Sequence, residues 1–318
     1  MSYRVFFAVA WALGGFGSLE AVSIRHDVAE AAYFDLAASF GAVGTFGSGG
    51  AACTGTLVSP THILTAAHCV DDNSDGILDE PDLSTYIVQF GMNSNNPDFT
   101  VSQIASITIN PMWQTSSGSA QYDMAVVTLA NPFAALAPIS VSMLDPTNQR
   151  GVGVGYGFSG TGQAPFENND DGLRRAFENT IDFFGTTPLD GLSLQTDFDS
   201  PAGNTSTFGS SVPLALEGTT ASGDSGGPLL VDFGSGFSLV GVLNGGSNPL
   251  GDFSEYGDQS IWAPVNSSAN IDFLTSNGIS IVPEPRSLAL VFGGGCLGFI
   301  VYRRRHHQSP AGCESAVA

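Results

Sequence analysis

The sequence predicts an all-β fold, built either as one large unit or as two packed barrels. Short runs rich in β-branched and aromatic residues alternate with clusters of Gly, Pro, Asn and Asp. The chain of 318 residues contains 40 glycines and only 12% charged residues, which favours many turns over long helices. Helical periodicity is scarce, and its best example is the short stretch 271–276. The predicted strands include residues 85–90, 101–109, 124–129, 229–231 and 237–243.

The N-terminal residues 1–23 are predicted to be a signal peptide. Arg4 provides the positive charge, and the apolar run at residues 5–16 is too short for a stable spanning helix. Ala21 and Ser23 are small residues that suit cleavage by signal peptidase. We therefore expect an exported protein, with a buried internal helix as the alternative interpretation of this segment.

Residues 282–307 are predicted to be a second targeting segment, followed by a tail at 308–318. A Pro-Glu-Pro tripeptide precedes an apolar stretch at residues 288–302, and three arginines follow it. The order of these parts resembles the PEP-CTERM sorting signal. That resemblance implies a bacterial protein that is transiently anchored in the membrane by this segment alone, processed by an exosortase-like sorting enzyme, and then secreted or kept at the cell surface. A plain C-terminal anchor is the alternative.

The charge balance excludes one class of partner. The formal net charge is −21, and all nine basic residues are arginine. Nucleic-acid binding rests on cationic neutralisation of phosphates, so we expect no nucleic-acid partner. The acidity is interpreted as a source of solubility or salt tolerance, in preference to selection for a charged partner.

The four cysteines divide into two groups. Cys296 lies in the apolar C-terminal stretch and Cys313 in the tail, so both are lost if that segment is processed. Cys53 and Cys69 lie in the body of the chain. In an oxidising compartment this pair predicts a disulfide, worth about 3 kcal/mol for a loop of that size in the chain-entropy model.

The strongest chemical signal is the hexapeptide GDSGGP at residues 223–228. A serine hydroxyl such as that of Ser225 becomes an effective nucleophile when a neighbouring base takes its proton. The flanking glycines let the backbone bend sharply and leave room for a substrate. They also allow the amides of Gly223 and Ser225 to point together at a developing oxyanion.

Two further motifs supply a candidate base and a candidate acid. His68 ends the stretch LTAAH, directly before Cys69, whose expected partner Cys53 belongs to the preceding strand. Asp123 stands directly before the apolar strand MAVV. A buried carboxylate can hold an imidazole in the tautomer that accepts the serine proton. The isolated His62 lacks such a context and is interpreted as a surface residue.

These motifs resemble the chymotrypsin/trypsin-like serine proteases, in which His, Asp and Ser occur in this order along the chain. The resemblance implies two packed six-stranded antiparallel β-barrels over residues 24–281, with a short C-terminal helix and the triad His68, Asp123 and Ser225 between the barrels. It further implies hydrolysis of protein or peptide substrates through an acyl-enzyme. Other matching segments are residues 53–58, 155–157, 241–246, 261–265 and 271–276.

The specificity pocket departs from the trypsin pattern. Thr219 occupies the position that sets the charge of the pocket floor, and Ala221 replaces a cysteine that usually forms a second disulfide. A buried substrate cation would lack its partner there, so cleavage after Arg or Lys is not expected. The predicted substrate-binding residues are Thr219, Thr220, Asn244, Gly245, Gly246 and Ser260.

An acidic loop directly after the histidine motif predicts a structural calcium site. Over residues 71–82, oxygen-bearing side chains and one glycine follow the spacing of an EF-hand loop, although position 12 is Asp rather than Glu and helices do not flank the loop. The alternative is a solvated acidic loop. The predicted ligands are Asp71, Asn73, Asp75, the carbonyl of Ile77, Asp79 and Asp82.

The resemblance also implies activation by a new N-terminus that pairs with the aspartate before the nucleophile, here Asp224. Cleavage after Ser23 would expose Ile24 for this role, and cleavage after Ala21 would expose Val22 instead. Arg25 or His26 are further candidate partners, because a buried carboxylate without a cation is costly.

Two rival functions are compatible with the same fold. A non-catalytic adhesion or scaffold protein could retain it, although such proteins normally lose a member of the triad. An esterase could use the same three residues.

Overall fold

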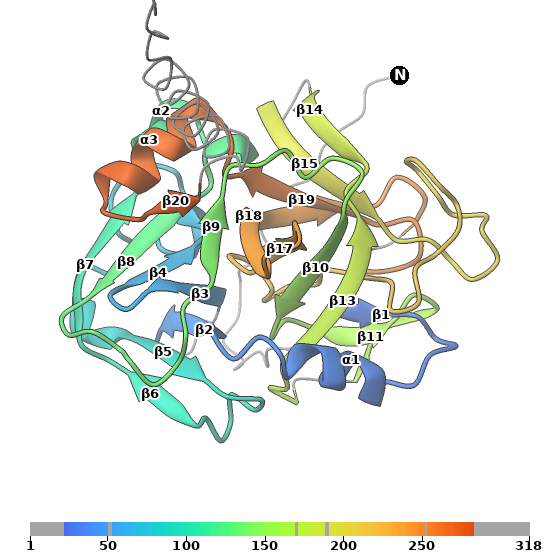
Figure 1. Ribbon diagram of the computed structural model, residues 1–318, viewed down its shortest axis with the longest axis horizontal. Coiled ribbons are helices and arrows are strands. Elements are labelled where there is room, and N and C mark those ends of the chain that lie inside the picture. The colour runs from blue at the N-terminus through green and yellow to red at the C-terminus, as the bar shows by residue number, and fades with distance from the viewer. Residues whose placement is uncertain (1–21, 50–52, 169–170, 188–190, 252, 283–318) are drawn as a thin grey trace, which may run out of the picture.

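The computed structural model describes residues 22–49, 53–168, 171–187, 191–251 and 253–282. The strands of this part of the chain curl into two packed barrels (Figure 1), as the sequence predicted. The body of the predicted signal peptide and residues 283–318 of the C-terminal signal lie outside the described residues. Within the described part, no helix is long and apolar enough to cross a membrane.

The first barrel is a seven-stranded sheet in the order β6-β5-β2-β3-β4-β8-β7. Alternating apolar residues of its strands, such as Tyr86, Val88 and Phe90 of β5, point into a closed core. The bounds are β2 Val43–Ser48, β3 Cys53–Ser59, β4 His62–Thr65, β5 Tyr86–Phe90, β6 Phe99–Val101, β7 Ile104–Ile109 and β8 Ala125–Leu129.

The second barrel contains a larger sheet in the order β13-β10-β17-β18-β19-β15-β14, with β9 and β20 attached beside β18. Its own core is built around Trp262, Phe177 and Leu194. The bounds are β9 Ser140–Ser142, β10 Arg150–Gly155, β13 Arg175–Thr180, β14 Phe183–Thr187, β15 Gly191–Asp197, β17 Pro228–Asp232, β18 Phe237–Ser247, β19 Gln259–Pro264 and β20 Ile281–Val282.

A four-stranded sheet in the order β12-β11-β1-β16 completes the second half. It joins the N-terminal strand β1 to the strand that precedes the GDSGGP turn, because Ser23 pairs with Thr219 and Ile24 with Gly218. The bounds are β1 Ser23–Ile24, β11 Ser159–Thr161, β12 Ala164–Asn168 and β16 Gly218–Thr219.

Hydrogen bonds connect the two barrels around an apolar interface. The hydroxyl of Tyr156 donates to the carbonyls of Val43 and Gly91, at 3.2 and 2.5 Å. The buried Arg174 reaches the same two carbonyls through Nη1. The apolar core around them takes side chains from both barrels, so the two barrels are closely packed against each other.

The described residues also form three α-helices, namely α1 Ala31–Ala37, α2 Pro111–Thr115 and α3 Ser268–Ser276. The last is the predicted C-terminal helix, and the Ser267 side chain caps it by accepting from Asn270 N. Helix α2 was not predicted, although Asn110 caps it and Pro111 opens it, which is a standard start signal. Short turns of 3₁₀ helix are η1 Ala67–Cys69, η2 Leu83–Thr85 and η3 Ala120–Tyr122.

Candidate active site

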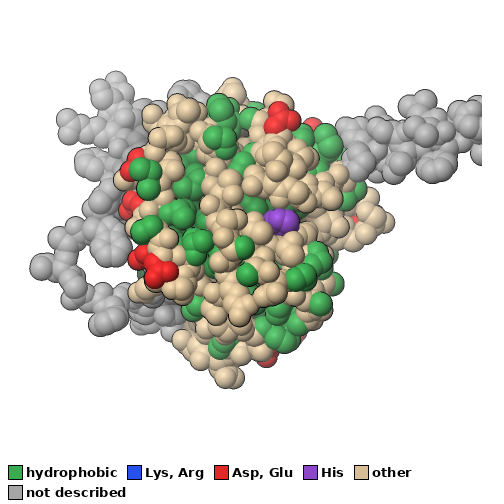
Figure 2. All heavy atoms as spheres, turned by 90° about the vertical axis from the view of Figure 1, so that its left-hand side faces the viewer, with side chains coloured by type: hydrophobic (Ala, Val, Ile, Leu, Met, Phe, Trp, Pro, Cys, Tyr) green, Lys and Arg blue, Asp and Glu red, His purple; other side chains and the backbone are tan. Residues whose placement is uncertain are grey.

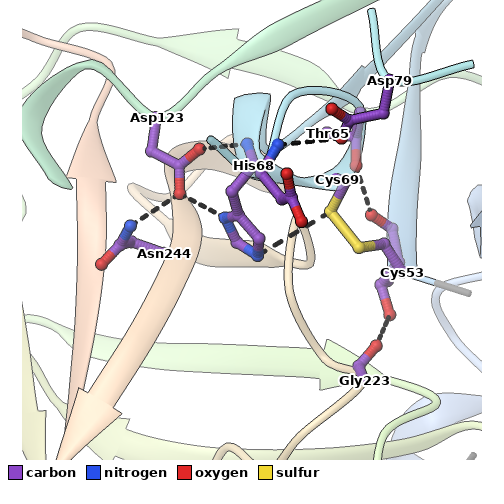
Figure 3. Close-up of a disulfide and its surroundings, with 10 residues drawn as sticks. Cys53, Thr65, His68, Cys69, Asp79, Asp123, Gly223 and Asn244 are labelled. Atoms are coloured by element: carbon purple, nitrogen blue, oxygen red, sulfur yellow. Dashed lines mark hydrogen bonds and ion pairs between the residues drawn. A yellow bond between two sulfur atoms is a disulfide. The ribbon is translucent and has the colours of Figure 1, made fainter. Parts of the chain in front are cut away.

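The first barrel brings His68 and Asp123 together. His68 lies in η1 directly after β4, and Asp123 ends η3 directly before β8. Because β4 and β8 are neighbours, with Thr65 opposite Ala125, the two side chains emerge side by side. His68 Nδ1 lies 2.6 Å from Asp123 Oδ2, and the His68 backbone amide donates to Oδ1 at 2.9 Å (Figure 3).

The second barrel contributes a contact that the sequence analysis missed. Asn244 of β18 donates through Nδ2 to Asp123 Oδ2 at 2.7 Å (Figure 3). The sequence predicted Asn244 as a substrate-binding residue, and that role stays a prediction, while the structure shows that its side chain also bonds to the carboxylate. The sequence gives no signal for the contact between Asn244 and Asp123, because this contact depends on how the two barrels meet.

The environment of His68 favours its protonated form. Burial lowers the pKa of His68, but the charge and hydrogen bond of Asp123, helped by Asp72, outweigh it and raise the pKa above the ordinary value. Asp123 itself is fully buried. Its carboxylate therefore orients the imidazole and stabilises an imidazolium at this position.

The disulfide between Cys53 and Cys69 is confirmed. It links β3 to η1 beside His68, and Cys69 Sγ lies 4.0 Å from His68 Nε2 (Figure 3). In the described residues, these three side chains are the one His/Cys/Asp/Glu group of three whose donor atoms lie within 4.8 Å of one another. The two sulfurs are bonded to each other and offer no thiolate, so this cluster is not a metal site.

Hydrogen bonds to both barrels hold the turn that carries Ser225. The Thr54 amide donates to the Ser225 carbonyl at 2.7 Å, and the Gly226 amide donates to the Leu243 carbonyl at 2.9 Å. Gly226 has φ +80°, and a Cβ there would lie 2.2 Å from Thr65 Oγ1, so only glycine fits. The turn consequently presents Ser225 at the junction between the barrels.

The backbone amides of this turn divide into two sets, according to whether they donate to a carbonyl of the protein. Those of Asp224, Gly226 and Gly227 donate to carbonyls of the protein. In the described part of the chain, the amides of Gly223 and Ser225 make no hydrogen bond to protein. These are the two donors that the sequence assigned to an oxyanion hole.

The carboxylate of Asp224 is buried under the same turn. It accepts from Gly157 N at 2.7 Å and from Ala221 N at 2.8 Å. A Cβ at Gly155 would lie 2.0 Å from Asp224 Oδ1, which explains the first glycine of the Gly-Tyr-Gly segment. Burial raises the pKa of Asp224 to about 6, although these amides partly offset that rise.

The predicted pairing of Ile24 with Asp224 is corrected by the structure. The backbone nitrogen of Val22 lies 3.3 Å from Asp224 Oδ2, while Ile24 is held two residues further along in β1. The other candidate partners are engaged elsewhere. Arg25 binds Asp27, and His26 contacts a tyrosine hydroxyl. Val22 was the competing alternative for this position.

Hydroxyl groups converge at the predicted specificity pocket. Ser260 Oγ lies 3.0 Å from Thr219 Oγ1 and 2.8 Å from Thr220 Oγ1, and all three residues are buried. Gly246 of β18 pairs with Ser260, and Gly245 is next to it. The structure thus brings Thr219, Thr220 and Ser260 together, beside Asn244, Gly245 and Gly246 of β18.

Comparisons with known proteins agree with this geometry. The trypsin family model matches residues 34–182. The chain is 30% identical over 78 residues to chymotrypsin-like elastase family member 1 of Canis lupus familiaris, a match that covers 24% of this chain and 28% of the elastase. A solved structure of a Glu endopeptidase in complex with MPD matches with a TM-score of 0.51 and 18% identity, over 81% of this chain and 98% of that chain.

The trypsin family model covers less than half of this chain. The fold of the chain is the chymotrypsin-like double β-barrel, as predicted. The matched segment contains His68 and Asp123, while Ser225 lies beyond it in the second barrel. The roles of the three residues therefore rest on their arrangement in the structure.

The acidic loop at residues 71–82 is folded around its first aspartate. The buried Asp71 accepts from Asp75 N at 3.0 Å and from Gly76 N at 2.9 Å. Asp79 accepts from Asp72 N at 2.9 Å, and burial raises the pKa of Asp79. These contacts draw the loop into a tight turn at Gly76, where φ is +79°.

The oxygen-bearing residues of the loop do not all contact the same turn. Asn73 accepts from Asp75 N, whereas the exposed Asp82 caps η2 by accepting from Ser84 N. The side chain of Ile77 is exposed, which leaves its backbone at the surface of the loop. No three carboxylates of this described loop have oxygens within 4.8 Å of one another.

We predict that Asp123→Asn lowers the pKa of His68. Asp123 raises that pKa through its charge and hydrogen bond, and an amide supplies no charge. An NMR titration of the His68 ring in the wild type and the variant measures the shift, with the exposed Asp35→Asn as the control. An unchanged midpoint would show that the contact in Figure 3 is absent in solution.

Proposed function

We propose that this protein is a secreted serine endopeptidase. Ser225 attacks the scissile carbonyl, His68 accepts its proton and returns it to the leaving amine, and Asp123 orients the imidazole. The observation that carries the proposal is the chain of contacts from Asn244 through the buried Asp123 to His68, at the junction where the turn of Ser225 is held.

Stabilisation of the oxyanion is assigned to the amides of Gly223 and Ser225. They have no protein acceptor among the described residues, while their neighbours in the turn are all satisfied. Two converging donors of this kind stabilise the charge that develops on the carbonyl oxygen in the transition state. A scaffold protein would gain nothing from leaving these two donors without an acceptor.

The hydroxyl pocket supports specificity for an uncharged side chain rather than Arg or Lys. Thr219 and Ser260 supply dipoles but no carboxylate to balance a buried cation. Ser260 Oγ accepts from Thr220 N at 3.2 Å as well as contacting both threonine hydroxyls, so its hydrogen-bonding capacity is used up. Selectivity for substrate groups then falls to the two threonines.

We expect Ser225→Ala to abolish amide hydrolysis while the protein stays folded. The nucleophile is lost, and a loss of about 10⁶-fold in kcat is typical for such a substitution. Turnover of a peptide library and labelling by a fluorophosphonate probe measure the effect, with Ser222→Ala, in the same turn, as the matched control.

Wild-type activity in Ser225→Ala would refute the mechanism. Hydrolysis of esters without hydrolysis of amides would identify an esterase instead. A folded wild-type protein that neither reacts with the probe nor cleaves either substrate would identify a scaffold protein.

We further propose that cleavage after Ala21 creates the mature N-terminus at Val22. The Val22 nitrogen already lies beside Asp224. Val22 also has φ +48°, a costly conformation for a β-branched residue within a continuous chain. Cleavage removes the peptide group before Val22, and with it the strained φ angle. It also turns the Val22 amide into an ammonium group, which neutralises the buried carboxylate of Asp224.

The Val22 proposal predicts a pH-dependent gain in stability. In a chain that retains Ala21, the pKa of Asp224 is about 6, above its ordinary value of 3.8. The native state then binds more protons than the unfolded state between about pH 4 and pH 6, so stability falls as the pH rises through that window. The ammonium of Val22 offsets this loss.

Urea unfolding of two Ser225→Ala chains, one starting at Val22 and one at Ala21, tests this prediction. The Val22 chain should be more stable at pH 7, and the difference should vanish below about pH 4. Equal stability at both pH values, or an active secreted protein that begins elsewhere, would contradict it.

The acidic loop is proposed to bind calcium. The oxygen donors of Asp71, Asn73, Asp75, Asp79 and Asp82 and the carbonyl of Ile77 are the kind of ligand that Ca²⁺ prefers. Asp71 is buried and already organises the turn at Gly76, which supports the proposal. Bound calcium would brace the segment that follows His68 and would take no part in the chemistry.

Removal of calcium should lower the melting temperature of the Ser225→Ala protein. A ligand that binds only the native state, present at 100 times its Kd, adds about 2.7 kcal/mol to the free energy of unfolding. Asp75→Asn with Asp79→Asn should reduce this sensitivity, while Asp72→Asn, outside the ligand positions, should retain it. Differential scanning calorimetry with calcium or chelator measures the effect. An undiminished calcium effect in the double variant would refute the loop site.

The targeting predictions complete the proposal. We propose export through the N-terminal signal, transient anchoring through residues 288–302, and release or surface display after processing by a sorting enzyme. The disulfide supports an oxidising destination.

A further inference from the structure

The hydroxyl pocket has a fixed hydrogen-bonding pattern, which is set by Ser260. Its Oγ accepts from Thr220 N at 3.2 Å, and it lies 3.0 Å from Thr219 Oγ1 and 2.8 Å from Thr220 Oγ1. A hydroxyl oxygen has two lone pairs and one proton. Because the amide takes one lone pair, one threonine donates its proton to Ser260 and the other threonine accepts the proton of Ser260.

The two threonine hydroxyls keep a defined capacity for a ligand. Among the described residues, neither hydroxyl has a further hydrogen-bond partner. The threonine that accepts from Ser260 has its own O–H group free, and the threonine that donates to Ser260 has only lone pairs free. Whichever threonine takes which part, the pocket offers one free donor beside free acceptors, and all of them belong to uncharged groups.

Three further buried polar atoms belong to the neighbours of the pocket residues. Ser23 Oγ, Thr196 Oγ1 and Trp262 Nε1 make no hydrogen bond within the described structure, and all three residues are at most 1% exposed. Ser23 lies opposite Thr219 where β1 pairs with β16, and Thr196 lies opposite Ser260 where β15 pairs with β19. Residues that lie opposite each other project from the same side of a sheet, and so do residues two apart on one strand, such as Ser260 and Trp262. The polar lining therefore extends beyond the three hydroxyls of the pocket.

This lining favours a polar substrate side chain over an apolar one. A buried polar atom without a partner costs about 1–3 kcal/mol. The indole N–H of Trp262 only donates, whereas the hydroxyls of Ser23 and Thr196 both donate and accept. A side chain that brings both donors and acceptors, together with any water that follows it, satisfies such a lining, and an apolar side chain leaves it unsatisfied.

A glycine keeps the side of the pocket beside Ser260 free of side chains. Gly246 of β18 pairs with Ser260 of β19, and these two strands lie next to each other in Figure 1. A Cβ at Gly246 would lie 2.7 Å from the carbonyl oxygen of Gln259, so a larger residue does not fit there. A substrate side chain can therefore approach the hydroxyls past Gly246.

Negative charge around the pocket acts against an acidic substrate side chain. The buried carboxylate of Asp258 has its Oδ1 3.7 Å from the position that a Cβ of Gly246 would take. Its oxygens accept from Gln259 N and Ser254 N, both at 2.9 Å. The net charge of the chain is −21, and the molecular face in Figure 2 shows acidic side chains and no basic one among its described residues. A second carboxylate would be repelled at short range by Asp258 and at long range by this field.

We propose that the hydroxyl pocket selects a primary amide, so that the enzyme cleaves after glutamine or asparagine. This inference rests on the proposed endopeptidase function. The amide oxygen accepts from the free O–H of one threonine, and the amide NH₂ donates to a lone pair of the other. A carboxylate can use only the donor, and an ammonium group can use only the acceptors. An apolar side chain uses neither and leaves the hydroxyls without a ligand.

A series of peptides that differ only in the residue before the cleaved bond tests the proposal on the secreted, processed wild-type protein. The series places Gln, Asn, Leu, Glu or Arg at this position, and Arg is included because Asp258 is the one pocket neighbour named here that would attract a cation. We expect kcat/KM for the better amide to exceed that for Leu, Glu and Arg by roughly 10-fold or more, which is what two ordinary hydrogen bonds supply.

The variant Thr220→Val removes one hydroxyl and keeps the branched shape of the side chain. We expect it to lower the ratio of kcat/KM between the amide and the leucine substrate by roughly 10-fold, and Thr220→Ser to restore most of this ratio. The matched control is Thr100→Val, at an exposed position of β6 in the first barrel, which should leave the ratio unchanged. Damage to the fold alone would lower the activity on all substrates alike, so the ratio reports the pocket.

Labelling by a fluorophosphonate probe separates the failure of this inference from the failure of the proposed function. A protein that reacts with the probe but cleaves best after Leu, Glu or Arg would overturn the amide assignment and leave the endopeptidase proposal intact. An unchanged ratio in Thr220→Val would overturn the assignment as well. A protein that neither reacts with the probe nor cleaves any peptide would overturn both proposals. The wild-type series decides the question even if a Thr220 variant does not fold.

Discussion

The buried carboxylate of Asp123 is the contact on which the candidate site depends. It belongs to the first barrel and holds His68 of that barrel, yet Asn244 of the second barrel donates to the same oxygen. The carboxylate that orients the imidazole is thus bonded by side chains from both barrels. The turn of Ser225 likewise bonds to both barrels. The Ser225 carbonyl accepts from the amide of Thr54 in the first barrel, and the Gly226 amide donates to Leu243 in the second. Packing of the two barrels therefore completes the site, and the apolar interface with Tyr156 and Arg174 stabilises the packed arrangement.

Much of this arrangement could be predicted from the sequence, because it depends on local patterns. The strands, the terminal helix, the double barrel and the Cys53–Cys69 disulfide follow from periodicity, turn residues and motifs. Predictions failed where the answer depends on contacts between distant segments. The contact of Asn244 with Asp123 was not expected from the sequence. Ile24 was expected at Asp224, and the pairing of β1 with β16 moves Val22 there instead.

A group of acidic residues in the second barrel was missed for the same reason. Asp182, Asp197, Asp199 and Glu217 are scattered among ordinary loop residues in the sequence. Only the folded chain shows that Asp197, Asp199 and Glu217 are buried and that the ion pairs of the described residues involve none of the four acids. With so few arginines and no lysine, this protein has little means of neutralising buried carboxylates with its own side chains. An N-terminal ammonium is one remaining source of positive charge.

Two groups of buried carboxylates lie along a single strand of the second half. The strand β16 starts directly after Glu217, pairs with β1 behind Val22, and ends at Thr219 in the hydroxyl pocket. Five residues beyond its end, Asp224 lies under the Ser225 turn. Disorder at the acid group would displace Glu217 and with it the strand, because Glu217 binds both Asp199 and Leu214. Disorder at Val22 would displace the same strand from its other side. The pocket floor is therefore held between two buried carboxylate sites, and its order depends on how well each is compensated.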